Sequence, residues 1–373
     1  MTRIGFAYNQ KPEHIAADDA AELARPDEEP PSSGAATATL ISPAPAADDE
    51  YAEWDSPATI DAVFNALSAY GEVIRLEATD DFPLRLRDAR PDIVFNIAEG
   101  LRGPNREAHV PAICEFYGIP YSGSDPFTLA LCLDKARTKE ILRARDVPTA
   151  DWTLVTGSTE LQGFIASSPR LPLFAKPVHE GSSKGITERN YIDALDSIEP
   201  VVSDLLERYQ QPVIVEAFLP GAEFTCGVLG NGASARVLPI VGMNFGALPD
   251  GALPIYGFEA KWLWDTPEDP LAIFECPASI PDELRAEIES VVLRAYQALG
   301  CRDWSRIDVR LDVDGRVNVV EVNPLPGILP DPRDNSCLPK AARAAGLSYD
   351  ALIATALLAA ADRQGVAMTR AAR

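Results

Sequence analysis

The stretch Val319–Gly327, "VVEVNPLPG", sets a carboxylate and a carboxamide two positions apart inside a run of strand-forming residues. Residues i and i+2 of a β-strand point to the same face, so Glu321 and Asn323 present two oxygen donors side by side. Hard oxygen donors suit Mg²⁺, which takes few protein ligands and completes its coordination with water and phosphate oxygens. The stretch therefore predicts a magnesium site and directs attention to residues that bind phosphate.

The segment just before this stretch predicts a hairpin. In "RLDVDGRVNVV" the pair Asp314-Gly315 forms a turn between two alternating strands. Arg306 and Asp308 lie two positions apart on the first strand and share a face. Asp308, Glu321 and Asn323 together offer three oxygen ligands, with the cation of Arg306 beside them. A single acid in a strand usually faces solvent, but this combination across one hairpin favours a functional site.

A glycine-containing segment is the first candidate for binding phosphate. "FAKPVHEGSSKGI" has Lys176 at the end of an apolar strand, followed by Gly181, Ser182, Ser183 and Gly185. Small residues let backbone N–H groups approach phosphate oxygens, and hydroxyls add donors. The spacing is neither that of a P-loop nor Gly-x-Gly-x-x-Gly. Taken alone, the segment is explained equally well as a surface turn.

Two further segments carry candidate nucleotide-binding residues. Lys135 lies in the helical stretch "LDKARTK", where a solvated surface charge is the ordinary alternative. Glu216 and Glu223 lie in "VIVEAFLPGAEFT", at the end of a strand and at a domain junction. Carboxylates at such an edge can bind ribose hydroxyls, and the backbone between them can contact an adenine edge. Two ordinary exposed acids are the alternative explanation.

Bulk composition restricts the classes of partner. The chain has 373 residues, 46% of them hydrophobic, which predicts two or three domains. Its net charge of −23 argues against nucleic acid and anionic membranes as partners, although local cations can still hold a nucleotide. The six cysteines are scattered without a C-x-x-C pair, which predicts reduced thiols. With no signal peptide or long apolar run, we expect a cytoplasmic protein.

The order of segments predicts an α/β fold. Strands and helices alternate in the first third of the chain, which is typical of a parallel α/β domain. Its first helix is expected to have Ser56 as N-cap and Pro57 at the first helical position. Residues 24–50 are rich in Pro, Ala and acids and predict a disordered insertion. Residues 125–146 are expected to form one helix, and residues 243–270 a long Gly- and Pro-containing loop.

These motifs together resemble a known family. The order of Lys135, Lys176, "EGSSKG", "VEAFLPGAEF", "EAKW", "RID" and "EVNPLPG" is similar to the ATP-grasp superfamily and, more closely, to the D-alanine–D-alanine ligase family. The resemblance runs from about Asn96 to Ile353. It implies three α/β domains with ATP between the central and C-terminal ones. The boundaries expected are 1–123, 124–215 and 216–365, with a tail at 366–373.

The resemblance also implies roles for residues on the nucleotide side. ATP would be the cosubstrate, held by phosphate-binding lysines, a mobile phosphate loop and a purine pocket. The residues expected to bind it are Lys135, Lys176, Gly181, Ser182, Ser183, Glu216, Ala217, Leu219, Glu223 and Lys261. Two Mg²⁺ ions, with Mn²⁺ as a possible replacement, would be held by Asp308, Glu321 and Asn323.

On the catalytic side, the resemblance implies an ATP-dependent carboxylate–amine ligase. It would join two amino acids or small peptides through an acyl phosphate and release ADP and phosphate. Arg306 and the backbone N–H of Gly327 would form an oxyanion hole, with Ser183 and Lys261 assisting at the phosphate. Ser336 would bind the carboxylate of the second amino acid. The resemblance further suggests a homodimer.

The departures from the family pattern gather on the substrate side. The family's "REVS"-like stretch is absent, and "AEWDSPAT" makes Glu53 the candidate in its place. Where the family has "HGxxGEDG", this chain has "EGLRGPNREA", with Glu99, Arg106 and Glu107. Trp262 replaces a tyrosine after "EAK". These changes favour the same reaction on a different substrate, and a phosphotransferase or a nucleotide-binding pseudoenzyme are the alternatives from other classes.

Overall fold

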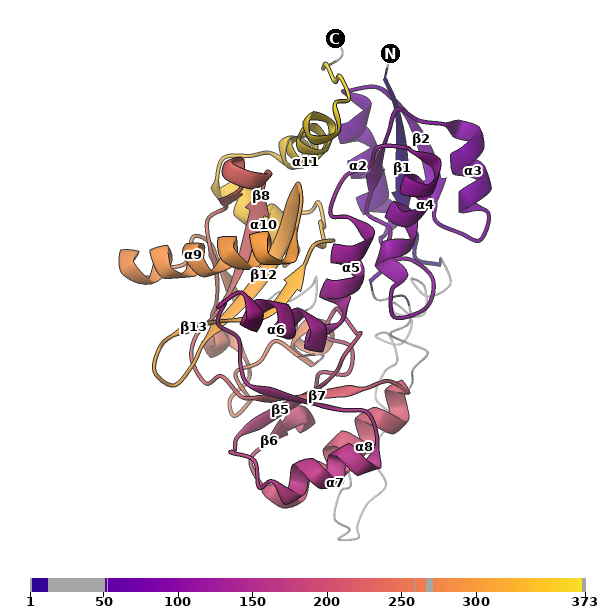
Figure 1. Cartoon of the computed structure of the whole chain (residues 1–373). Helices are drawn as coiled ribbons and strands as arrows, with labels where there is room; N and C mark the ends of the chain where they lie inside the picture. The colour runs from indigo at the N-terminus through magenta and orange to yellow at the C-terminus, as the bar shows by residue number, and fades with distance from the viewer. Residues whose placement is uncertain (1, 13–50, 52, 258, 266–270, 371–373) are drawn as a thin grey trace, which may run out of the picture.

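The computed structural model describes residues 2–12, 51, 53–257, 259–265 and 271–370, and the predicted insertion at 24–50 lies outside the described residues. Three sheets organise the chain. Figure 1 shows the first sheet beside the third, and the second at the far end of the molecule beyond helix α6 (Lys135–Ala144). The alternating α/β architecture expected from the sequence is confirmed.

The first sheet is parallel, as predicted. Its strands are β1 (Arg3–Tyr8), β2 (Glu72–Glu77) and β3 (Ile93–Asn96), in the order β2-β1-β3. The helices α2 (Pro57–Ser68), α3 (Phe82–Ala89) and α4 (His109–Tyr117) accompany it. Helix α2 begins as expected: the Ser56 side chain accepts a hydrogen bond from the Thr59 backbone, and Pro57 opens the first turn.

The second sheet is antiparallel and carries two of the predicted nucleotide segments. It contains β4 (Trp152–Val155), β7 (Val213–Ala217), β5 (Leu173–Pro177) and β6 (Tyr191–Ile192), in that spatial order. Helices α7 (Ser158–Ala166) and α8 (Ile198–Tyr209) pack against it through a core that includes Leu161, Val202 and Val215. Figure 1 shows both helices on the outer side of this sheet. Its opposite face is left for the candidate site.

The third sheet holds the predicted hairpin. Its strands are β8 (Glu223–Leu229), β9 (Arg236–Val237), β10 (Val241–Met243), β11 (Phe274–Glu275), β12 (Trp304–Leu311) and β13 (Val317–Asn323), in the order β11-β10-β8-β12-β13 with β9 on β8. The β12–β13 hairpin is confirmed, and Gly315 in its turn has a φ of +77°, which glycine adopts without strain. Helix α9 (Asp282–Leu299) packs on this sheet.

The single helix expected over residues 125–146 is wrong. The chain forms α5 (Pro126–Leu133) and α6 (Lys135–Ala144), separated at Asp134, whose backbone is extended. The Asp134 side chain accepts a hydrogen bond from the Arg137 backbone and so caps a new helix. The break frees the Lys135 N–H to donate to the carbonyl of Val178, at 3.3 Å. Side-chain capping that the apolar pattern does not reveal therefore anchors the start of α6 beside β5.

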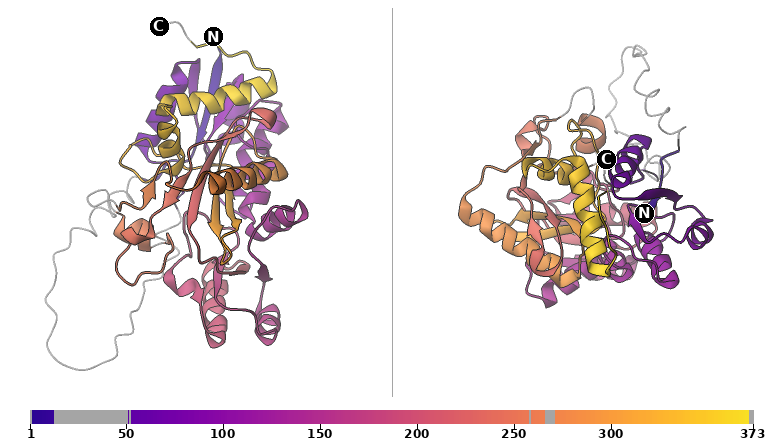
Figure 2. Two further views of the ribbon diagram at one scale, coloured as in Figure 1. Left: turned by 90° about the vertical axis from the view of Figure 1, so that its left-hand side faces the viewer. Right: turned by 90° about the horizontal axis from the view of Figure 1, so that it is seen from above.

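The remaining elements are short or C-terminal. A π-helical turn covers Glu259–Trp264, and short 3-10 turns occur at Arg106–Ala108, Glu188–Asn190, Leu195–Ser197, Gly232–Ser234 and Phe245–Ala247. Helices α10 (Cys337–Ala344) and α11 (Tyr349–Gln364) end the fold, and α11 packs across α2 at the end of the molecule where β1 begins (Figure 2).

We find no single helix in the described part of the chain that is long and apolar enough to cross a membrane. Helices α10 and α11 reach that length and composition only as a pair bent by 100°. Leu338, Leu352 and Leu357 of this pair lie in the buried core shared with β1 and α2.

Candidate active site

The hairpin brings its four predicted polar residues together. In the register of β12 and β13, Arg306 lies opposite Asn323 and Asp308 opposite Glu321. Arg306 Nη2 lies 3.0 Å from Asp308 Oδ2 and 3.9 Å from Glu321 Oε2. A bulge follows Asp308, because Val309 pairs with Val319 and leaves Val320 extra. Bulges near sites re-aim side chains, and this one lies beside the two acids.

Electrostatics distinguish the two carboxylates. Burial raises the pKa of Asp308, and the attraction of Arg306 only partly opposes this. Burial also acts to raise the pKa of Glu321, but Lys135 and Arg306 overcome it and lower that pKa to about 2. The pKa of Arg306 is raised, since Asp308 and Glu321 outweigh the effect of its burial. Glu321 is therefore an anion held between two cations.

The donor set fits a divalent cation. Asp308 Oδ1 is buried and has no hydrogen-bond partner among the described residues, and the same holds for Asn323 Nδ2. Buried polar atoms are normally satisfied, so a carboxylate oxygen without a hydrogen-bond partner beside an ionised glutamate fits a divalent cation. No three His, Cys, Asp or Glu side chains of the described segments cluster for a metal. A site here thus needs the amide oxygen of Asn323 or oxygens from a ligand.

Both lysines expected to bind phosphate are buried and held by carboxylates of the site. Lys135 Nζ lies 3.0 Å from Glu321 Oε1 and also donates to the carbonyl of Glu180. Lys176 Nζ lies 3.0 Å from Glu216 Oε2. Lys135 comes from the start of α6, so its ion pair with Glu321 ties that helix to β13 of the third sheet. Lys176 and Glu216 lie on the neighbouring strands β5 and β7 of the second sheet.

The glycine–serine loop lies over these lysines. Ser182 and Ser183 have φ values of +50° and +61°, in the left-handed region that directs successive N–H groups toward one side. Ser183 Oγ donates to the carbonyl of Tyr256 at 3.2 Å, so the loop contacts the 243–270 segment. A side chain on Gly181 would meet Glu53 Oε1 at 2.4 Å and would have to displace that carboxylate.

Glu53 forms ion pairs with two cations. Arg106 Nη2 lies 2.8 Å and Lys184 Nζ 3.2 Å from Glu53 Oε2. Lys184 also pairs with Glu180 at 2.8 Å, and Arg106 donates to the carbonyl of His179 at 3.1 Å. Although burial acts to raise it, Arg106 and Lys184 hold the pKa of Glu53 below its usual value. Glu53, a candidate for binding substrate, thus ties the glycine–serine loop to the turn that contains Arg106.

The purine-side candidates run from the end of β7, in the second sheet, to the start of β8, in the third sheet. Ala217 ends β7 and Leu219 follows it, both half-buried. Glu223 begins β8 and pairs with Arg310 at 2.9 Å. Burial raises the pKa of Glu223 despite this partner. Arg310 also donates to the carbonyl of Pro254 at 2.8 Å, so it links the 243–270 segment to the start of β8.

Two residues predicted to contact the substrates, Gly327 and Ser336, lie close together. Ser336 Oγ accepts from the Leu329 backbone at 3.1 Å and donates to the Gly327 carbonyl at 3.4 Å.

The pKa of Lys261 is lowered to about 8, first by burial and then by the like charge of Arg306. The side chain of Trp262 lies outside the described residues.

Glu99 and Glu107 are two further acids that lie near Glu53. The pKa of Glu99 is raised well above its usual value by burial and by Glu107 and Glu53. The pKa of Glu107 is raised to about 8 by burial and by Glu53. Glu107 lies in the turn at Arg106–Ala108, which also contains Arg106, the ion-pair partner of Glu53.

Comparison with known proteins decides the family. The model of the family "D-ala D-ala ligase C-terminus" matches residues 141–358. The D-alanine–D-alanine ligase of Actinobacillus succinogenes is 35% identical over 296 residues, which cover 78% of this chain and 88% of that protein. That of Bordetella pertussis is 38% identical and covers 66% and 72%. The chain belongs to the D-alanine–D-alanine ligase family. It is accordingly an ATP-dependent ligase.

Solved structures agree on the ATP-grasp fold of this D-alanine–D-alanine ligase family member. The D-alanine–D-alanine ligase of Bacillus anthracis complexed with ATP has a TM-score of 0.67 at 21% identity, covering 98% of this chain and 99% of that one. The D-Ala:D-Ser ligase VanG of Enterococcus faecalis has a TM-score of 0.66 at 20% identity, covering 96% and 99%. At these identities the similarity concerns the fold.

One buried residue of this ligase-family site escaped the sequence analysis. Lys139 Nζ lies 3.4 Å from Glu216 Oε1, so Glu216 faces two lysines. Although burial acts to raise it, Lys139 and Lys176 hold the pKa of Glu216 below its usual value. The signal was present in "LDKARTK": Lys139 is four residues after Lys135 and thus on the same helical face.

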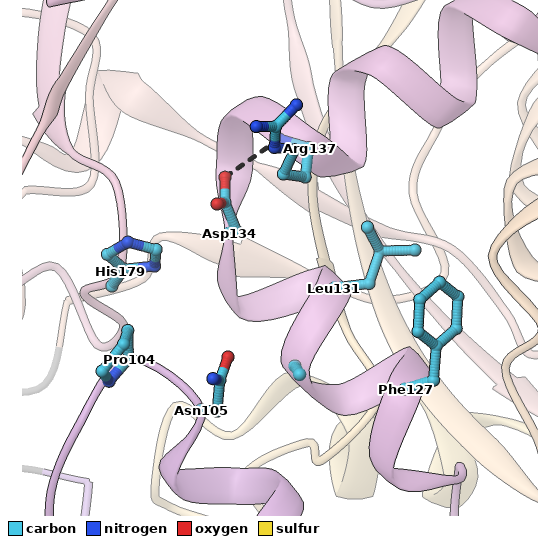
Figure 3. A pocket seen from close by; sticks show the side chains of 8 residues that line it. Pro104, Asn105, Phe127, Leu131, Asp134, Arg137 and His179 are labelled. Atoms are coloured by element: carbon cyan, nitrogen blue, oxygen red, sulfur yellow. Dashed lines mark hydrogen bonds between the residues drawn. The ribbon is translucent and has the colours of Figure 1, made fainter. Parts of the chain in front are cut away.

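A separate pocket of about 350 Å³ lies on the far side of the α5–α6 junction. Figure 3 shows Phe127 and Leu131 of α5 on one side of it, facing Asn105 and His179 on the other, with Asp134 capping α6 between them. None of the site residues predicted from the sequence lines this pocket. The residues predicted to form the site therefore lie outside this pocket.

Proposed function

We propose that this protein joins the carboxylate of one amino acid to the amine of another, using ATP and forming an acyl phosphate. The observation that carries the proposal is the 3.0 Å ion pair between Lys135 and Glu321. It sets the lysine proposed to bind phosphate against the hairpin proposed to hold the metal. A nucleotide with its phosphates at this contact would meet Lys135, Lys176 and the glycine–serine loop together.

The nucleotide would occupy the space between the second and third sheets. Lys135 and Lys176 would bind its phosphates under the loop of Gly181, Ser182 and Ser183. The purine and ribose would contact the strand edge formed by Glu216, Ala217, Leu219 and Glu223. Lys261 would approach the γ-phosphate from the segment that Ser183 contacts through the Tyr256 carbonyl.

Asp308, Glu321 and Asn323 would hold Mg²⁺. When bound, the cation neutralises charge that develops on the transferred phosphoryl group. Support comes from the orphaned Asp308 Oδ1 and the low pKa of Glu321, which keeps that carboxylate ionised. Two Mg²⁺ ions, with Mn²⁺ able to replace them, belong to this proposal.

The reaction would proceed in two displacements. A carboxylate oxygen of the first substrate attacks the γ-phosphorus, and the bond to the β,γ-bridging oxygen breaks to release ADP. The neutral amine of the second substrate then attacks the acyl carbon, and the carbon–oxygen bond to phosphate breaks after the amine loses a proton. Arg306 and the Gly327 N–H would stabilise the tetrahedral oxyanion. The glycine–serine loop and the 243–270 segment would exclude water from the acyl phosphate.

D-Alanine as both substrates is the narrow form of the proposal, which would place the protein in peptidoglycan synthesis. A different amino acid or small peptide is the second candidate, and the Glu53 network favours it. Glu53 is already neutralised by Arg106 and Lys184, so it is a poor site for a substrate ammonium. Glu99 and Glu107 then remain for that group, and Ser336 for the second carboxylate.

Several finer elements of the proposal concern setting and assembly. We expect the protein to work in the cytoplasm as a homodimer, without nucleic acid or membrane partners. The domains expected are 1–123, 124–215 and 216–365, with the tail after them. Helices α5 and α6 are assigned to the central domain by these limits, although Cys132 and Leu142 of these helices pack with the third-sheet core.

Phosphate release from MgATP tests the proposal. The assay would offer single amino acids and pairs in both enantiomers, with mass spectrometry of the product. Release that depends on an amine substrate and a product with a new amide bond are expected. D-Ala–D-Ala as product supports the narrow form, and another amide supports the second. ATP hydrolysis without any amide product, or no turnover with any pair, would contradict the ligase proposal.

A further inference from the structure

Glu216 is a buried carboxylate shared by two buried ammonium groups. It is 5% exposed, while Lys176 is 5% and Lys139 2% exposed. Lys176 reaches Oε2 at 3.0 Å from the neighbouring strand β5, and Lys139 reaches Oε1 at 3.4 Å from helix α6. The three side chains thus come from three elements and meet where the nucleotide is expected.

The two lysines are held differently. Lys139 Nζ also donates to Thr149 Oγ1 at 2.7 Å, and Thr149 Oγ1 donates to the Val319 carbonyl at 2.8 Å. Its ammonium further lies 5.9 Å from the centre of the Trp152 ring. Lys139 is therefore fixed by several partners. Among the described residues, the ion pair with Glu216 is the single one formed by Lys176.

This difference distinguishes Lys139, a counter-ion that can stay on Glu216, from Lys176, which can exchange Glu216 for another partner. A buried carboxylate that loses its last cation is left uncompensated in a low-dielectric surrounding, which is strongly unfavourable. If Lys176 were alone on Glu216, a phosphate could recruit it only against that penalty. With Lys139 in place, Glu216 keeps a cation when Lys176 turns to the nucleotide.

We propose that Lys139 is a positioning residue: it remains on Glu216 and thereby frees Lys176 to bind nucleotide phosphate. The inference rests on the proposed function, in which Lys176 is a phosphate ligand. The hairpin shows the same arrangement at Glu321, which has Lys135 at 3.0 Å and Arg306 as a second cation at 3.9 Å. In both places one carboxylate contacts two cations.

The test compares ligands with and without phosphate. The Kd of MgADP is measured by calorimetry, and adenosine is measured as a competitive inhibitor against ATP. We expect Lys139→Met to weaken MgADP binding at least tenfold while the adenosine inhibition constant changes less than twofold. Lys139→Gln, which can still hydrogen-bond Thr149, should show the same selective loss and serves if Lys139→Met folds poorly. A merely structural role would weaken both ligands together.

A charge-matched rescue completes the design. Adding Glu216→Gln to Lys139→Met removes the carboxylate that traps Lys176, so the ratio of the ADP and adenosine constants should return to within threefold of wild type. Arg143→Met is the control, because Arg143 lies one turn further along α6 and pairs with exposed Asp151 at 2.7 Å; we expect wild-type binding.

The failures are distinguishable. A wild-type protein that binds neither ADP nor ATP would overturn the proposed function as well. Wild-type ADP binding with an unchanged ratio in both Lys139 variants, or an altered ratio that Glu216→Gln does not restore, would overturn the role of Lys139 alone.

Discussion

The ammonium of Lys135 lies 3.0 Å from the carboxylate of Glu321, although 186 positions separate them in the chain. Arg306 is paired with Asp308 in the same way, and Lys176 with Glu216. The cations expected to bind phosphate and the anions expected to bind metal therefore neutralise one another. MgATP would exchange these partners, since the metal takes the carboxylates and the phosphates take the lysines. Binding by exchange avoids leaving any buried charge alone.

The first prediction concerns the hairpin carboxylate. Glu321→Gln should lower ATP turnover by more than the 10–100-fold typical of losing an outer-shell metal partner, because a direct ligand is removed. Turnover is followed as phosphate release across a Mg²⁺ titration. Asp314→Asn in the exposed turn of the same hairpin is the control and should behave as wild type. Near-normal rates for Glu321→Gln would contradict the metal assignment.

The second prediction concerns the oxyanion. Arg306→Ala should reduce kcat by about 10²–10³, the range found when one oxyanion-hole donor is removed. The KM for ATP should change little if Arg306 acts on the tetrahedral step. Arg316, exposed in the hairpin turn, supplies the matched Arg→Ala control. Equal losses in kcat and ATP affinity would instead assign Arg306 to nucleotide binding.

The third prediction concerns the tie between the first domain and the glycine–serine loop. Glu53→Gln leaves Arg106 without this ion pair and Lys184 with Glu180 alone, whereas Lys184→Met leaves Glu53 paired with Arg106. Breaking a buried pair costs about 3–5 kcal/mol, so Glu53→Gln should lower the melting temperature clearly. The loss for Lys184→Met should be smaller, and calorimetry measures both. The reverse order would show that the network is not centred on Glu53.

The fourth prediction is a pH dependence. The pKa of Lys261 is lowered to about 8, so its ammonium is present below pH 8 and is lost as the pH rises through that value. We expect kcat/KM for ATP to fall above about pH 8, because this ratio reports groups of the free enzyme. Lys261→Arg keeps the charge at all these pH values and should remove the falling limb. A limb that persists unchanged would point to Lys139, whose pKa burial lowers to about 8 as well.

The fifth prediction concerns the acidic, Pro-rich insertion. Its flanks meet in the described structure, since Lys11 N donates to the Asp55 carbonyl and Asp55 N to the Asn9 carbonyl, both at 3.0 Å. A shorter connection between ends that already meet lowers the entropic cost of closing the loop. Replacing residues 26–47 by a short Gly-Ser linker should therefore leave the melting temperature within a few degrees, measured by circular dichroism. A large drop would show that the segment stabilises the fold.

Local chemistry allowed much of this protein to be anticipated. The two-residue period of a strand places Arg306 with Asp308 and Glu321 with Asn323, and a hairpin turn at Asp314-Gly315 sets the two pairs opposite each other. Ser56 and Pro57 likewise define a helix start by short-range hydrogen bonding and fixed backbone geometry. These features depend on neighbours in the chain, so the residue pattern contains them.

Tertiary structure decided the ionic partners. Asp134 breaks a continuous helical pattern because its side chain caps a new helix. Lys139 is buried because its ammonium pairs with Glu216, which lies on a strand distant in the sequence. Glu53 acquires Arg106 and Lys184 from segments 53 and 131 residues away. The sequence by itself determined which chemical groups stand on each strand and helix. Only the packing of three sheets determined which charges meet, because Coulomb attraction and desolvation depend on distance in space rather than along the chain.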